Sequence, residues 1–166
     1  MDKFQLIQQK IHTPESMQQL LNLWRFKGYK IVFTNGCFDL LHYGHADYLS
    51  KAAGLGDVLV VGVNGDASVS KLKGPHRPLN DQLTRMTLLA SFFYVNAVIP
   101  FDEETPYDLI SMIQPDVLVK GGDYEVERIV GYDIVKKKGG EVVTIPFVPG
   151  YSTTAIEQKI LRSGAE

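Results

Sequence analysis

The segment Lys30-Ile-Val-Phe-Thr-Asn-Gly-Cys-Phe-Asp-Leu-Leu-His-Tyr-Gly-His45 joins an apolar run to two histidines that stand three residues apart across a glycine. The apolar run predicts a strand over residues 31–34, and a helix is expected over residues 44–53. A glycine-containing turn between a strand and a helix leaves unpaired backbone N–H groups and the positive end of the helix dipole at the carboxyl edge of the strand. Anions bind at such places, so we expect His42 and His45 to face phosphate groups.

Outward from this segment, apolar strand-like runs alternate with amphipathic helical stretches. We expect strands at residues 31–34, 57–63, 97–100, 117–120 and 142–145. Helices are expected at residues 13–26, 44–53, 80–92, 105–114 and 125–138, and a last helix is expected to begin with a capping box at residues 154–157. The alternation predicts an α/β fold with a doubly wound five-stranded parallel sheet and an extra N-terminal helix. Such sheets bind ligands beyond the carboxyl ends of their strands.

The composition favours one compact domain and limits its partners. The 166 residues are 45% hydrophobic, which suits a single domain with an N-terminal helical extension (1–29) and a core (30–163). The net charge of -2 gives no general attraction to nucleic acid or to an anionic membrane. One cysteine excludes an internal disulfide, and neither a signal-like segment nor an apolar run of membrane-spanning length is present. We therefore expect a cytoplasmic location.

The segment from Gly36 to His45 resembles the signature of the nucleotidyltransferase superfamily, whose His-x-Gly-His box handles the nucleotide triphosphate. Further motifs in the same order are similar to the adenylyltransferase family that makes ADP-heptose for lipopolysaccharide: Asn35-Gly36-x-Phe38-Asp39, Leu72-Lys73-Gly74, Arg77-Pro78, Lys120-Gly-Gly-Asp-Tyr124, Gly139-Gly-Glu-Val142 and Tyr151-Ser-Thr-Thr154. The resemblance implies a Rossmann-like fold and transfer of AMP from ATP to D-glycero-β-D-manno-heptose 1-phosphate, with release of pyrophosphate. It also implies Mg²⁺ held largely by the triphosphate.

Such a reaction needs cations and hydrogen-bond donors rather than a strong base, because the attacking phosphate oxygen is already anionic. His42 and His45 fit as donors, and His45 is expected to lie closest to the helix N-terminus, on the leaving-group side. The basic run Lys71-Leu-Lys-Gly-Pro-His-Arg-Pro78 predicts a shaped loop in which Lys73 binds substrate phosphate. Arg85 is expected either to face the phosphates, as the resemblance implies, or to pair with Asp81 at i,i+4 spacing.

Nucleotide contacts are implied for residues at two strand ends and at the entrance of the last helix: Asn35, Gly36, Cys37, Phe38, Gly121, Asp123, Ser152, Thr153 and Thr154. Thr154 is also expected to cap that helix, and a tight turn explains the paired glycines equally well. Cys37 fits a small residue in a turn better than a nucleophile. Asp39 is expected to bind the hydroxyls of the acceptor or to steady a histidine. A protein-held metal is not expected, because zinc sites need three or four ligands.

Several alternatives remain open. A cytidylyltransferase acting on glycerol 3-phosphate or a phosphoalcohol has similar motifs, although Phe147-Val-Pro149 stands where those enzymes often carry an arginine. A class I aminoacyl-tRNA synthetase fragment shares a similar histidine box, but its lysine-rich loop is absent. A non-catalytic nucleotide-binding module would retain the same pocket. Many relatives are fused to a sugar kinase, for which this chain has no room, so we expect a separate kinase in the pathway and, more weakly, a homo-oligomer.

Overall fold

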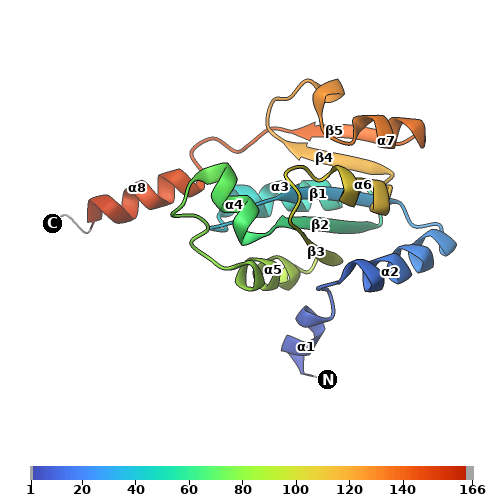
Figure 1. The fold of residues 1–166 in the computed structure, drawn as a ribbon, viewed down its shortest axis with the longest axis horizontal. Helices are drawn as coiled ribbons and strands as arrows, with labels where there is room; N and C mark the ends of the chain where they lie inside the picture. The colour runs from blue at the N-terminus through green and yellow to red at the C-terminus, as the bar shows by residue number, and fades with distance from the viewer. Residues whose placement is uncertain (1, 164–166) are drawn as a thin grey trace.

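The computed structural model describes residues 2–163, which form a parallel sheet covered by helices on both faces (Figure 1). The strands are β1 (Ile31–Gly36), β2 (Val58–Asn64), β3 (Ala97–Phe101), β4 (Val117–Gly121) and β5 (Glu141–Ile145). Their order in the sheet is β3-β2-β1-β4-β5, and every pair is parallel. The doubly wound five-stranded sheet predicted from the sequence is confirmed, and its order reverses beside β1.

The helices are α1 (Lys3–Gln8), α2 (Pro14–Phe26), α3 (Tyr43–Ala53), α4 (Asp66–Lys73), α5 (Gln82–Ser91), α6 (Tyr107–Ile113), α7 (Tyr132–Lys137) and α8 (Thr153–Ser163), with a 3₁₀ turn, η1, at Val126–Arg128. Helices α2, α6 and α7 pack on one face of the sheet, and α3 and α5 pack on the other. Strand β2 is buried at every position, and its alternate residues enter the two different cores. Helix α8 extends away from the sheet (Figure 1) and buries none of its residues.

Three local predictions are wrong in detail. Two helices rather than one precede β1, and the first begins with a capping box in which the side chains of Asp2 and Gln5 each bond the other residue's backbone N–H. Lys71 and Lys73 lie in the last turn of α4 rather than in a loop, and the chain leaves that helix at Gly74 with φ of +104°. The helix expected at residues 125–138 is broken at Gly131, where φ is +89° and a Cβ would lie 2.7 Å from Ile110.

The N-terminal segment contributes to the core. Met17 and Leu21 of α2 are fully buried against β1 and β3 residues. Ile11 forms an isolated parallel bridge with Val98 on the edge strand β3. Removing this segment would therefore expose one face of the sheet. None of the described helices combines the length and the apolar character needed to cross a membrane.

Candidate active site

The two histidines stand at the start of α3, directly beyond the carboxyl end of β1. His42 is the N-cap residue of this helix, with extended backbone, and its side chain makes no capping hydrogen bond. His45 lies within the first turn, so the expectation that His45 is closest to the helix N-terminus is wrong. The two rings stack, with centroids 3.8 Å apart and planes inclined by 25°. Both imidazoles therefore sit at the positive end of the helix dipole.

Gly44 is required by this stacked arrangement. A Cβ at this position would lie 3.1 Å from both Cε1 and Nδ1 of His42, and 3.4 Å from the Cβ of Tyr151. Contacts of 3.1 Å are tighter than ordinary carbon contacts, so any side chain here would push the His42 ring aside. The glycine between the histidines thus allows His42 to fold over the helix start.

One ring nitrogen of each histidine lacks a hydrogen-bond partner. The Nδ1 atoms of His42 and His45 are buried and have no hydrogen-bond partner among residues 2–163. Burial, reinforced by the nearby charges of His42 and Lys73, lowers the pKa of His45 to about 4, and burial also lowers the pKa of His42. Both rings are therefore neutral at pH 7. Buried nitrogens without partners are costly in a folded protein unless a ligand meets them.

Two adjoining cavities surround the histidines. The central cavity, of about 300 Å³, is lined by Asn35, Gly36, Cys37, Phe38, His45, Tyr48, Lys73, Lys120, Gly121, Tyr124 and Phe147. The histidine cavity, of about 270 Å³, is lined by His42, Gly44, His45, Tyr48, Lys73, Phe147, Val148, Tyr151, Ser152, Thr153 and Thr154. His45, Tyr48, Lys73 and Phe147 line both. The structure thus brings most of the predicted site residues together, and their roles in binding stay predictions.

The entrance of α8 differs from the expectation for Thr154. The helix begins at Thr153, and the Oγ of Ser152 accepts a hydrogen bond from the backbone N–H of Ala155 at 3.0 Å, so Ser152 is the cap. The predicted cap at Thr154 is therefore wrong by two residues. Ser152, Thr153 and Thr154 all line the histidine cavity. Asp123 is exposed and lines neither of the two cavities.

Asp39 organises the loop between α4 and α5. Its buried carboxylate accepts hydrogen bonds from the backbone N–H groups of Leu79 at 2.8 Å and Asn80 at 3.0 Å, and it pairs with Arg77 at 2.8 Å. Burial alone would raise the pKa of Asp39, but these donors outweigh it and hold the pKa below its usual value. Both carboxylate oxygens face this loop, so the expectation that Asp39 steadies a histidine is wrong. Arg77 continues the network to Glu157 of α8.

Arg85 is fully buried. Its guanidinium donates to the carbonyls of Cys37 at 2.6 Å, Asn64 at 2.8 Å and Asn80 at 3.0 Å, and to the carboxylate of Asp66 at 2.7 Å. The ion pair is therefore with Asp66 and not with Asp81, which instead caps α5. This guanidinium ties the ends of β1 and β2 together. Its predicted contact with phosphate stays a prediction, since Arg85 lines neither the central nor the histidine cavity.

Lys120 and Tyr48 are among the polar residues of the central cavity that sequence reasoning missed. Lys120 lies at the carboxyl end of β4, and burial lowers its pKa. Tyr48 shares a hydrogen bond of 2.6 Å with the Thr34 hydroxyl and donates to the Val119 carbonyl at 3.3 Å, and burial raises its pKa to about 12. A charged residue directly after the apolar run Val117-Leu-Val119 was the available signal for Lys120.

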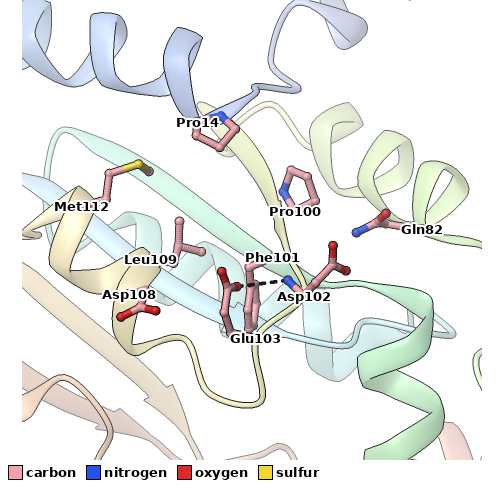
Figure 2. A pocket seen from close by; sticks show the side chains of 9 residues that line it. All are labelled: Pro14, Gln82, Pro100, Phe101, Asp102, Glu103, Asp108, Leu109 and Met112. Carbon is pink, nitrogen blue, oxygen red and sulfur yellow. Dashed lines mark hydrogen bonds between the residues drawn. The ribbon is translucent and has the colours of Figure 1, made fainter.

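A larger cavity lies elsewhere, at the carboxyl end of β3 (Figure 2). It measures about 480 Å³, and its lining includes the carboxylates of Asp102, Glu103 and Asp108 and no cationic side chain. Three carboxylates would repel a polyphosphate, so this cavity does not suit the triphosphate. Among residues 2–163, no three histidine, cysteine or acidic side chains gather in a way that could hold a metal ion.

Comparison with known proteins places this geometry in context. Residues 33–159 match the family described as cytidylyltransferase-like. The chain is 54% identical over 153 residues to the bifunctional protein HldE of Wolinella succinogenes, covering 92% of this chain and 31% of that protein. It is 58% identical over 134 residues to the protein of the same name from a Nitratiruptor species, covering 81% of this chain and 28% of that protein. This chain thus spans about a third of the length of the curated relatives it matches.

Two solved structures are similar as well. The lipopolysaccharide core biosynthesis protein from Thermoplasma volcanium superposes with a TM-score of 0.58 at 28% identity, covering 73% of this chain and 98% of that one. Pantoate-beta-alanine ligase from Francisella tularensis superposes with a TM-score of 0.61 at 17% identity, covering 92% of this chain and 78% of that one. The second likeness concerns the fold alone.

Proposed function

The chain belongs to the cytidylyltransferase-like family of nucleotidyltransferases, and we propose that it transfers AMP from ATP to D-glycero-β-D-manno-heptose 1-phosphate, giving ADP-heptose and pyrophosphate. Identity above 50% to proteins named HldE and the likeness to a lipopolysaccharide core biosynthesis protein support this substrate class. The motifs that resemble the ADP-heptose family, from Asn35-Gly36 to Tyr151-Ser-Thr-Thr154, are consistent with it. We place the reaction in the cytoplasm, with a sugar kinase supplying the acceptor.

The stacked histidine pair with its unpartnered nitrogens is the observation that carries the proposal. Two neutral imidazoles at the N-terminus of α3 can each donate a hydrogen bond to a phosphate oxygen, and the helix dipole favours the negative charge there. Lys73 adds a cation that lines both cavities. The residues Ser152 and Thr153, whose side chains carry hydroxyls, also line the histidine cavity, where α8 begins.

The reaction then proceeds as an in-line displacement. An anionic oxygen of the sugar 1-phosphate forms a bond to the α-phosphorus of ATP. The bond from that phosphorus to the bridging oxygen breaks, and its electron pair leaves with pyrophosphate, so no general base is needed. His42, His45 and Lys73 stabilise the negative charge that builds on the departing pyrophosphate. Mg²⁺ would enter with ATP and be held by its phosphates, and the carboxylate of Asp39 is already occupied by protein donors.

A matrix of substrates tests the proposal. The purified chain is incubated with ATP, CTP, GTP or UTP against heptose 1-phosphate, glycerol 3-phosphate or phosphocholine, and pyrophosphate release is followed. The proposal predicts turnover with ATP and heptose 1-phosphate far above every other pair. A preference for CTP with glycerol 3-phosphate would replace the adenylyl assignment by a cytidylyl one. Nucleotide binding without pyrophosphate release from any pair would identify a non-catalytic module instead.

A further inference from the structure

Lys120 stands where two cavities of different character meet. A second cavity of about 160 Å³, here called the outer cavity, adjoins the central cavity beside β4, and its walls include Pro106, Leu118 and Ile129. The residues common to the central and outer cavities are Asn35, Lys120 and Tyr124. Lys120 is therefore the cation at the junction, and Arg128 of η1 adds a second cation to the outer cavity.

The Lys120 ammonium lacks the acidic partner that some other lysines of this protein have. Lys51 pairs with Asp47 at 2.7 Å, and Lys138 pairs with Asp116 at 2.7 Å, whereas Lys120 has no ion pair or hydrogen bond within residues 2–163. Lys120 is half-buried, and burial without a nearby counter-ion lowers its pKa, so its charged form is less favourable here than in water. Packing alone does not explain a lysine here, because an apolar side chain would fill the same place at lower cost. An anionic ligand would supply the missing partner.

The three cavities follow one another in a fixed sequence. The histidine and central cavities share His45 and Lys73, the central and outer cavities share Lys120, and the histidine and outer cavities have no residue in common. In-line displacement requires the attacking and leaving oxygens to lie on opposite sides of the reacting phosphorus. If pyrophosphate leaves toward His42, His45 and Lys73, the attacking oxygen must enter from the other side of the central cavity. We take that side to be the junction at Lys120, because the outer cavity that adjoins it shares no lining residue with the histidine cavity.

We infer that Lys120 binds the phosphate of the acceptor, a sugar 1-phosphate that enters through the outer cavity. This inference rests on the proposed function and assigns the acceptor subsite within it. The ammonium neutralises the phosphomonoester and holds one of its oxygens toward the α-phosphorus of the nucleotide. Lys73 therefore binds phosphate on the nucleotide side, and Lys120 binds phosphate on the acceptor side.

The experiment compares Lys120→Met and Lys120→Arg with the control Lys137→Met, which removes an exposed lysine of α7 remote from these cavities. For Lys120→Met we expect the KM for the acceptor to rise about 10- to 100-fold, the range of a lost charge-assisted hydrogen bond. The Kd for α,β-methylene-ATP, measured by calorimetry, should change less than about twofold. Lys120→Arg should recover part of the acceptor affinity, and Lys137→Met should match the wild type.

Thermal unfolding gives a readout that a merely structural lysine would not produce. Because Met replaces a desolvated charge by an apolar chain of similar length, Lys120→Met should melt at or above the wild-type temperature. An unchanged acceptor KM, a loss of nucleotide affinity instead, or a lower melting temperature in Lys120→Met would each overturn the inference while leaving wild-type turnover intact. Absence of turnover in the wild type with any phosphorylated acceptor would overturn both this inference and the proposed function.

Discussion

Gly44 lies between the stacked histidines, and its replacement by alanine should separate activity from stability. Alanine is favoured over glycine within a helix by about 1 kcal/mol, and Gly44 lies in the first turn of α3 with helical backbone. The new methyl group, however, would meet Cε1 and Nδ1 of His42 at 3.1 Å, where ordinary contacts begin near 3.4 Å. The ring must therefore move by a few tenths of an ångström. We expect stability to be kept or raised while the His42 ring leaves its place over the triphosphate site.

The size of the activity loss follows from the displacement. A misplacement of about 1 Å costs on the order of a hundredfold in rate, so a shift of a few tenths of an ångström should lower kcat by roughly 3- to 10-fold. Pyrophosphate release under saturating substrates measures kcat, and thermal unfolding measures stability. Gly54→Ala is the matched control, because it lies at the other end of α3 with φ of -67° and its Cβ would meet its nearest neighbour, the Lys51 carbonyl, at 3.4 Å. Wild-type kcat in Gly44→Ala would refute this reasoning.

Three further predictions concern the same framework. His45→Ala should keep the circular dichroism spectrum of the wild type and lower kcat by about a hundredfold or more, because it removes a donor to the leaving group; near-normal turnover would exclude that role. Burial lowers the pKa of His45 to about 4 in the folded protein, from 6.5 for a free histidine side chain, so between these pH values the unfolded chain binds more protons. Stability should therefore fall as the pH drops from 6.5 to 4, and His45 should not affect its pH dependence above that range. Melting temperatures of the wild type and His45→Ala across this range check it, since His45→Ala should lose part of the acid sensitivity. Arg85→Met strips the carbonyls of Cys37, Asn64 and Asn80 of their donor and should lower the free energy of unfolding by about 3 kcal/mol, measured by urea denaturation; a change below about 1 kcal/mol would show that the buried network is not needed for stability.

The five strands and their parallel, doubly wound arrangement could be predicted from the sequence, because buried parallel strands are continuous apolar runs. The run from Val58 to Val63 enters both cores, and no other element type of that length fits it. The histidine box could also be identified from the sequence. The structure explains its glycine, because a side chain at residue 44 would contact His42 too closely. The spacing of apolar residues and of the histidine box along the chain was therefore enough to predict the fold and the centre of the candidate site.

The roles of charged residues whose partners are distant in the sequence could not be predicted. Asp39 and Arg85 are charged residues near the predicted site, but their partners lie 40 and 48 residues away along the chain, at Leu79 and Cys37. Spacing along a helix suggested Asp81 for Arg85, whereas the fold brings Asp66 to it. Lys120 was overlooked for a similar reason, because its burial depends on the walls of two cavities that come from separate segments.

The most direct test of the account uses the imidazole nuclear magnetic resonance signals of the four histidines. The signals of His42 and His45, assigned with His42→Ala and His45→Ala, are followed while a non-hydrolysable ATP analogue with Mg²⁺ is added. His12, which lies before α2 and contacts Ser16, serves as the internal reference. The account predicts that the two stacked rings shift at saturation while His12 does not. Unchanged signals from residues 42 and 45 with nucleotide bound would contradict it.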